Sequence, residues 1–151
     1  MSTSEITTFW QELYQEAQEI FKKEPVLEDI LNKQILSCSG LDLCLARIIS
    51  AKLATREVDR QQLFQVCMQA YSDDCDLLAC AVADVMAVAN RDPASKSKVR
   101  ILLFLKGPHV LESWRISHWL WQKGRCDLAS YIQSRISDVF SVDIHPAAKI
   151  G

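Results

Sequence analysis

Apolar residues recur at intervals of three and four along most of the chain, and this spacing places them on one face of successive α-helices. Short polar stretches containing proline, glycine, serine or aspartate separate these apolar runs. The pattern predicts an all-α fold whose helices cover residues 4–23, 25–38, 41–53, 59–71, 75–90, 101–105, 109–122 and 126–139.

Residues that favour helix ends support these boundaries. Ser4 and Asp59 have side chains that can cap the first backbone N–H groups of a helix. Pro25 fits the first turn of the second helix, because that turn needs no N–H donor. Pro93 ends the helix before it, and Gly124 fits a helix C-cap. The linkers are therefore short, and the sequence contains no internal helical repeat.

Two of the predicted helices are unusual. The run Ile101–Leu105 fits either a strand or a helix, and we predict a helix because helices flank it on both sides. The helix at 75–90 is apolar around nearly its whole circumference, apart from Asp76 and Asp84. Such a helix lies at the centre of a bundle or in an interface between subunits.

The last eleven residues, 141–151, follow a different period. Ile144 and Ile150 are six residues apart, Gly151 follows the second, and the residues between them are short, polar or turn-forming. An aliphatic residue at every sixth position suits one coil of a triangular parallel β-helix. We therefore expect a helical domain at 1–140 that caps the first coil of a β-helix at 141–151, with the other coils absent from this chain.

Composition narrows the class of protein. A hydrophobic fraction of 49% and a charged fraction of 24% are those of an ordinary globular protein. No window approaches the ~18 apolar residues of a membrane span, and no secretory leader is visible, so we expect a cytoplasmic protein with reduced cysteines. The six cysteines form no Cys-x-x-Cys pair and none has zinc-ligand spacing from a histidine, so no metal site is predicted.

Charge is distributed unevenly along the chain. Residues 1–95 carry 8 basic and 15 acidic side chains, whereas residues 96–125 carry 7 basic and 1 acidic. Such a basic segment can bind an anion or a nucleic acid, but a solvated face or contact with a neighbouring acidic helix is the more common explanation. The net charge of −2 gives no general attraction to nucleic acid or membrane, and we expect neither as a partner.

Four short motifs stand out once the elements are placed. They are Arg91-Asp92-Pro93-Ala94, Leu105-Lys106-Gly107-x-His109, Arg115-Ile116-x-His118-Trp119-Leu120-Trp121 and the closing segment Val142–Gly151. In this combination the whole chain resembles the N-terminal part of the serine acetyltransferases, which are similar to other hexapeptide-repeat acyltransferases. Pro108 departs from the family pattern, which more often has an aromatic or other bulky residue at that position.

The resemblance implies an enzyme that transfers acetyl from acetyl-CoA to the hydroxyl of L-serine and is inhibited by L-cysteine. It also implies a helical domain on a left-handed β-helix, assembled as trimers or dimers of trimers, with a C-terminal tail that docks into cysteine synthase. The histidine base, the acetyl-CoA groove and that tail would lie beyond residue 151. We therefore expect this chain alone to be inactive and to bind no cofactor. The alternative is a stand-alone helical module for oligomerisation or protein interaction.

Two aspartates are the predicted site residues. By resemblance, Asp143 is the catalytic aspartate that orients the histidine base and stabilises its imidazolium. From the sequence alone, an aspartate after a helix more often accepts hydrogen bonds from nearby backbone N–H groups. By resemblance, Asp92 binds the ammonium group of serine and would accept L-cysteine at the same place. Its alternative role is that of a turn residue before proline.

The three histidines are given no catalytic role. His118 lies in a tryptophan-rich helix with no carboxylate at helical spacing to orient it, so we predict a core or interface histidine. His109 and His145 are interpreted in the same way. We expect the tryptophans of that helix to pack in a core or interface, because aromatic residues that stack on nucleotide bases usually lie on an exposed sheet or groove.

The helices at 75–90 and 109–122 together carry more apolar surface than a monomer of this size normally exposes. We therefore expect the chain to self-associate through its helices, with contacts mostly from its N-terminal half. If the bundle wraps these helices completely, the chain will instead be a monomer.

Overall fold

The chain begins with a long amphipathic helix. In the computed structural model, which describes residues 1–150, α1 spans Thr3–Lys23. Ser2, and not the predicted Ser4, is its N-cap: the Ser2 hydroxyl accepts from the Glu5 backbone N–H, and the Glu5 carboxylate accepts from the Ser2 backbone N–H. Ser2 is the better cap because a glutamate follows it by three residues, whereas Thr7 stands at that position after Ser4.

The predicted second helix is divided into three short pieces. Pro25–Leu27 form a 3-10 turn (η1), Glu28–Leu31 form α2, and Asn32–Leu36 form a π-helical turn (η2). Residues 28–36 contain no glycine or proline, so the sequence offers no signal for the widened turn. The segment still buries Leu31 and Ile35 completely, as the apolar pattern predicts.

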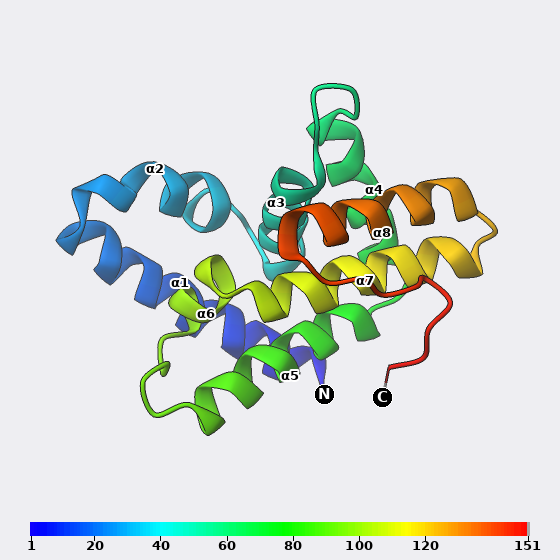
Figure 1. Ribbon diagram of the computed structural model, residues 1–151. Helices are drawn as coiled ribbons and strands as arrows, with labels where there is room; N and C mark the ends of the chain where they lie inside the picture. The colour runs from blue at the N-terminus through cyan, green and yellow to red at the C-terminus, as the bar shows by residue number, and fades with distance from the viewer. Residues whose placement is uncertain (151) are drawn as a thin grey trace.

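The other helices follow the predicted order (Figure 1). They are α3 (Leu41–Leu53), α4 (Arg60–Asp73), α5 (Asp76–Arg91), α6 (Lys98–Phe104), α7 (Lys106–Gln122) and α8 (Cys126–Phe140). Asp59 caps α4 as predicted, and Gly124 adopts the left-handed φ of +76° in the turn between α7 and α8. The predicted break at Gly107 and Pro108 is wrong, because both residues lie in the first turn of α7.

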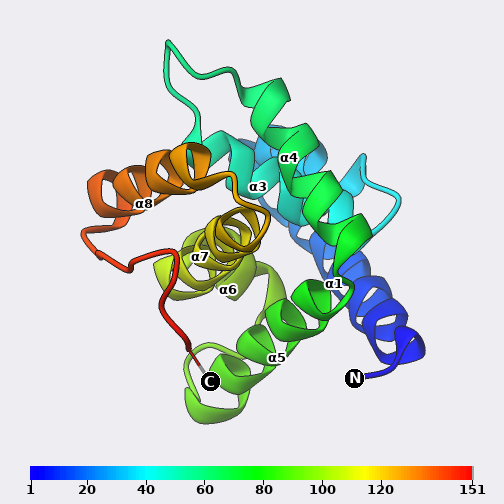
Figure 2. The same cartoon turned by 90° about the vertical axis from the view of Figure 1, so that its right-hand side faces the viewer.

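Helix α7 lies at the centre of the fold. Figure 2 views it nearly end-on, with α8, α3 and α5 around it, and α4 and α6 also contact it. Its buried residues include polar ones on several sides, among them His109, Glu112, Ser113 and Ser117. A helix buried on so many sides is well suited to hold other parts of the chain in fixed positions.

Helix α5 lies at an edge of the fold, along the lower margin of Figure 1. One face buries Leu77, Ala81, Val82 and Val85. Leu78, Met86 and Val88 are half-buried and pack against the same core. The exposed positions of α5 carry small or polar residues, among them Asp76, Cys80, Ala83 and Asn90, so the helix is central on one side only.

The chain after α8 turns sharply and runs back along α7 (Figure 1, red). Ser141 ends α8 with a left-handed φ of 58°, the only positive φ among the described residues other than glycine. Residues 142–150 contain no helix or strand, and a turn joins the Ala148 N–H to the His145 carbonyl oxygen at 3.0 Å. The structure is all-α over residues 1–150, as predicted, and Gly151, the last residue of the predicted β-coil, lies outside the described residues.

None of the helices in residues 1–150 is both long enough and apolar enough to cross a membrane.

Candidate functional site

The segment after α8, which carries Asp143, is attached to α7 by two hydrogen bonds. The Trp114 Nε1–H donates to the His145 carbonyl oxygen at 3.3 Å. The Nδ1 of His118 lies 2.6 Å from the carbonyl oxygen of Pro146, which is buried. Because a carbonyl oxygen only accepts, Nδ1 carries the proton, and the opposite nitrogen, Nε2, can accept from the Gln122 side-chain amide at 3.0 Å.

Aromatic contacts strengthen the same attachment. The Trp114 and His118 rings stack with their centroids 5.2 Å apart, and the Trp121 ring meets His145 edge-on at 5.0 Å. The Arg-x-x-His-Trp-Leu-Trp motif of α7 therefore holds residues 145 and 146. His118 and His145 therefore both make contacts that fix the position of this segment. His109 is also structural, since its Nε2 lies 2.6 Å from the Leu102 carbonyl oxygen in a buried position.

Asp143 is exposed, and its carboxylate is held from the side by α8. The Gln133 Nε2–H donates to Asp143 Oδ1 at 2.8 Å. Within residues 1–150, this is the only hydrogen bond to the carboxylate, and no backbone N–H reaches it. The alternative role, in which Asp143 satisfies nearby backbone groups, is therefore not what the side chain does here. One carboxylate oxygen is bound and the other is available to a further partner.

Asp92 follows α5 and is partly buried. Its Oδ1 accepts from the Ala94 N–H at 2.9 Å, and its carbonyl oxygen accepts from the Ser95 N–H at 3.1 Å. The turn role that the sequence allowed is therefore present, and one carboxylate oxygen is still free of hydrogen bonds within residues 1–150. Within residues 1–150, no hydrogen bond joins the Asp92 side chain to that of Asp143: the first is bonded to Ala94 and the second to Gln133.

A buried ion cluster joins α5 to α7. The Arg115 Nη1 lies 2.7 Å from Asp84 Oδ2 and 2.9 Å from Glu112 Oε2. Glu112 is only 1% exposed, and this burial raises its pKa, an effect that the neighbouring Arg115 opposes. Burial raises the pKa of Tyr71, and the charge of the neighbouring Glu112 carboxylate raises it further.

Three of the seven basic residues in the segment 96–125 pair with acidic residues of other helices. Lys98 pairs with Glu12 at 3.2 Å, and Lys123 pairs with Asp73 at 2.7 Å, in addition to the Arg115 cluster. The explanation by contact with neighbouring acidic helices is therefore correct for these three residues.

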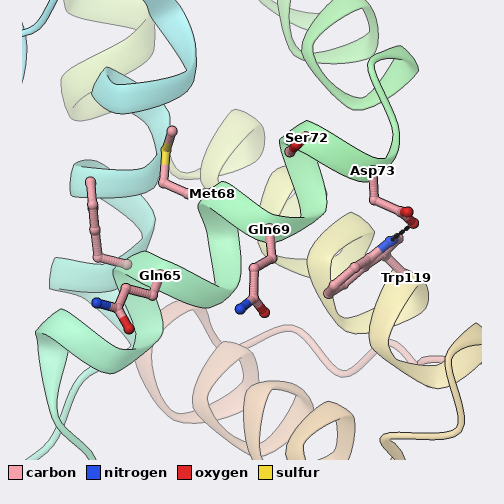
Figure 3. A pocket seen from close by; sticks show the side chains of 7 residues that line it. Gln65, Met68, Gln69, Ser72, Asp73 and Trp119 are labelled. Carbon is pink, nitrogen blue, oxygen red and sulfur yellow. Dashed lines mark hydrogen bonds between the residues drawn. The ribbon is translucent and has the colours of Figure 1, made fainter.

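A depression of about 690 Å³ lies on the outer face of α4 (Figure 3). It is lined by Phe64, Gln65, Met68, Gln69, Ser72, Asp73 and Trp119. Asp73 is its one ionisable residue, and hydrogen bonds from Lys123 and Trp119 lower the pKa of that carboxyl. An aspartate held in this way is a poor general base, so the depression is not a candidate catalytic site.

No group of three or more histidine, cysteine, aspartate or glutamate side chains in residues 1–150 is placed to hold a metal ion. All the cysteines are free thiols, and three of them are buried: Cys38, Cys44 and Cys67. Burial raises the pKa of Cys67 to about 12, which makes this thiol a weak nucleophile at neutral pH.

Comparison with known proteins places the chain in a family. Residues 9–113 match the family model described as serine acetyltransferase, N-terminal. A serine acetyltransferase from Buchnera aphidicola subsp. Schizaphis graminum is 41% identical over 151 residues, which are 100% of this chain and 58% of the relative. The chain belongs to the serine acetyltransferase family. It spans little more than half the length of that relative.

Solved serine acetyltransferase structures have the same fold over this region. One, in complex with CoA, matches with a TM-score of 0.93 at 40% identity, covering 97% of this chain and 62% of the other. Another, in complex with cysteine, matches with a TM-score of 0.91 at 41% identity, covering 94% and 59%. The helical architecture predicted for a serine acetyltransferase N-terminal region is confirmed.

Asp92 and Asp143 stay predicted site residues of this serine acetyltransferase region, but three residues that the structure makes prominent were not predicted from the sequence. Glu112 and Arg115 are spaced by three in one helix, and this pairing pattern was a usable signal. Gln133 gave none, because ten residues and a helix end separate it from Asp143.

Proposed function

We propose that this chain is the N-terminal part of an enzyme that transfers acetyl from acetyl-CoA to L-serine and gives O-acetyl-L-serine and CoA. The observation that carries the proposal is the 41% identity with a serine acetyltransferase along the whole chain. The solved relatives with CoA and with cysteine support acetyl-CoA as the co-substrate and L-cysteine as an inhibitor that resembles serine.

In the proposed reaction a histidine supplied beyond residue 151 removes the proton of the serine hydroxyl. The serine oxygen attacks the acetyl carbonyl carbon directly, and the bond from that carbon to the CoA sulfur breaks. The sulfur leaves as CoA after receiving the proton. No covalent enzyme intermediate is needed.

Asp143 would orient that histidine and stabilise its imidazolium. Three features of the described residues support this role: the carboxylate is exposed, its segment is fastened to α7, and only one of its oxygens is engaged. A carboxylate of this kind can accept the imidazole N–H with its second oxygen. The histidines within residues 1–150 are engaged in structural contacts, so none competes for the role.

Asp92 would bind the ammonium group of L-serine, and of L-cysteine in the inhibited enzyme. The partly buried carboxylate on a loop held by its own turn gives a charge of suitable sign, with one oxygen open to a ligand. An ammonium group and a carboxylate form a charge-assisted hydrogen bond, which favours an amino acid over an alcohol lacking the amine.

Assembly is part of the proposal. The exposed apolar side chain of Val26, in the N-terminal half, supports association of helical domains, and a β-helix continuing from 141–151 would form the trimer. We propose a trimer or a dimer of trimers in the cytoplasm, with cysteine synthase as a partner of a C-terminal tail. The predicted division into 1–140 and 141–151 belongs to the same proposal.

The test is an assay of the purified full-length protein with acetyl-CoA and L-serine, in which free CoA is measured. We expect turnover by the full-length protein and none by the 151-residue chain. A full-length protein that associates but releases no CoA would support the alternative, an oligomerisation or interaction module. Release of CoA by the 151-residue chain alone would contradict the proposal that the histidine base lies beyond residue 151.

A further inference from the structure

We infer that Gln133 is a positioning residue that orients the Asp143 carboxylate for its histidine partner. The inference rests on the proposed function of Asp143. It is carried by the 2.8 Å hydrogen bond from Gln133 Nε2 to Asp143 Oδ1, which joins α8 to the segment that follows it.

Gln133 is well placed to act as a fixed donor. Its neighbours on the core side of α8, Ile132 and Ile136, are 1% and 0% exposed, so this part of the helix is firmly packed. The left-handed Ser141 turns the chain back, so that Gln133 and Asp143, ten positions apart, meet across the end of α8. Gln133 itself is half-buried, which limits the rotamers open to its side chain.

The other anchors of this segment fix its backbone but leave the carboxylate free to turn. The Lys106 Nζ donates to the Phe140 carbonyl oxygen before Asp143, and Trp114 and His118 donate to the carbonyl oxygens of residues 145 and 146 after it. All three acceptors are backbone groups. Among the residues that the structure describes, only Gln133 touches the Asp143 carboxylate by a hydrogen bond. Contacts with α7 therefore fix the backbone of the segment around Asp143, and the contact with Gln133 of α8 fixes the plane of the Asp143 carboxylate.

An amide is a suitable group for this task. It donates to one carboxylate oxygen and leaves the other for an imidazole N–H. It does not titrate, so the orientation is maintained over the whole pH range in which the enzyme works. A carboxylate at the same place would repel Asp143, because two like charges at hydrogen-bond distance disfavour each other.

The test is a double-mutant cycle in the full-length protein. Gln133→Met keeps the length of the side chain and removes the amide, and we expect kcat to fall about tenfold, the value of a lost charge-assisted hydrogen bond. KM for serine should stay unchanged, because Gln133 is not proposed to touch serine. In an Asp143→Asn background the same substitution should cost much less, since the carboxylate that Gln133 orients is already gone. Gln133→Glu should lower kcat at least as far as Gln133→Met.

Ser134→Ala is the matched control. Ser134 is the next residue of α8, is exposed, and donates only to the Tyr131 carbonyl oxygen, so its removal should leave kcat unchanged. An equal loss from Gln133→Met in both backgrounds would overturn the inference in favour of a general structural role. An unchanged kcat in the wild-type background would overturn it as well.

A crystal structure of the full-length Gln133→Met variant separates this inference from the proposed function. We expect the Asp143 carboxylate to change its rotamer, or to occupy several, while the backbone of residues 142–146 keeps its place. A single unchanged rotamer would overturn the inference even if the enzyme is a serine acetyltransferase. If the rotamer changes in Gln133→Met but the wild-type full-length protein releases no CoA, the orienting contact is supported and only the proposed function is contradicted.

Discussion

The Nδ1 of His118 lies 2.6 Å from the carbonyl oxygen of Pro146, 28 residues further along the chain. This bond, together with the one from Trp114, attaches the segment that carries Asp143 to the most buried helix of the fold. The segment has no helix or strand of its own, so its conformation depends on these side-chain contacts.

His118→Phe should loosen this segment without unfolding the bundle. Phenylalanine can keep the stacking on Trp114 but cannot donate to Pro146, and the loss should be about 1 kcal/mol. Hydrogen exchange measured by mass spectrometry should show faster exchange in peptides covering 142–150 and unchanged exchange in α7. Gln122→Ala removes only the exposed partner of His118 and serves as the control. Equal exchange in His118→Phe and wild type would contradict the anchoring role.

Arg115→Met should destabilise the fold strongly. It leaves Glu112, which is 1% exposed, buried with no opposite charge, and breaking a buried pair in this way costs about 3–5 kcal/mol. Glu112→Gln added to Arg115→Met should recover part of the loss, because no uncompensated charge is then buried. Urea denaturation followed by circular dichroism measures both. A loss below about 1 kcal/mol for Arg115→Met would mean that Glu112 finds another partner or a proton at little cost.

Glu112 should also make stability depend on pH. Its pKa is raised in the folded state, so the folded protein binds this proton more tightly than the unfolded chain does. The Glu112 contribution to stability is therefore largest below the ordinary glutamate pKa and declines as pH rises through the raised pKa. Other carboxylates, such as Asp73 with its lowered pKa, act in the opposite direction.

The difference in unfolding free energy between wild type and Glu112→Gln isolates this contribution. We expect wild type to lose stability relative to the variant as pH rises from about 4 towards neutral. A difference that is flat, or that rises in favour of wild type, would contradict the raised pKa.

Substitutions at Asp143 and Asp92 should have different effects on the kinetics of the full-length protein. Asp143→Asn should lower kcat by one or more orders of magnitude, because its partner histidine loses a negative orienting group. Asp92→Ala should instead mainly raise KM for serine and weaken inhibition by L-cysteine. Initial rates at varied serine and cysteine concentrations distinguish the two patterns. An unchanged kcat in Asp143→Asn would return that residue to a structural role.

Contacts between helices should promote self-association of this chain. Light scattering at micromolar concentration should give a mass above the 17.1 kDa of one chain. Val26→Asp places a charge on an apolar side chain of the N-terminal half that is 91% exposed and should reduce the mass, whereas Asn90→Asp at an exposed polar position should not. A monomer that is indifferent to dilution in the wild type would leave assembly to residues beyond this chain.

Helices were predictable from this sequence where local signals are strong. Asp59, Gly124 and the three- and four-residue apolar spacing placed α3, α4, α7 and α8 to within a few residues. The π-helical turn at 32–36 could not be predicted from the sequence. Its geometry follows from packing Leu31 and Ile35 into the core and not from a turn-forming residue. The same is true of Ser141, since serine has no strong preference for the left-handed region.

For the candidate site, the sequence predicts only residues that lie within a short motif. Asp92 and Asp143 were proposed because they stand in short stretches that resemble the family. Their surroundings depend on contacts across the fold: Trp114 reaches a carbonyl 31 residues away, and Arg115 reaches a carboxylate on another helix. Contacts of this kind do not produce a regular spacing of residues, so the sequence pattern cannot predict them.

The turn at Ser141 has a practical consequence for protein engineering. A chimera that exchanges β-helices between relatives would be spliced most naturally at the end of α8, after residue 140. That junction would place foreign residues against Trp114 and His118, whose partners are the carbonyl oxygens of residues 145 and 146. A splice after Pro146 keeps donor and acceptor from the same parent. The crossover point suited to recombination therefore lies several residues beyond the end of α8 and not at the end of that helix.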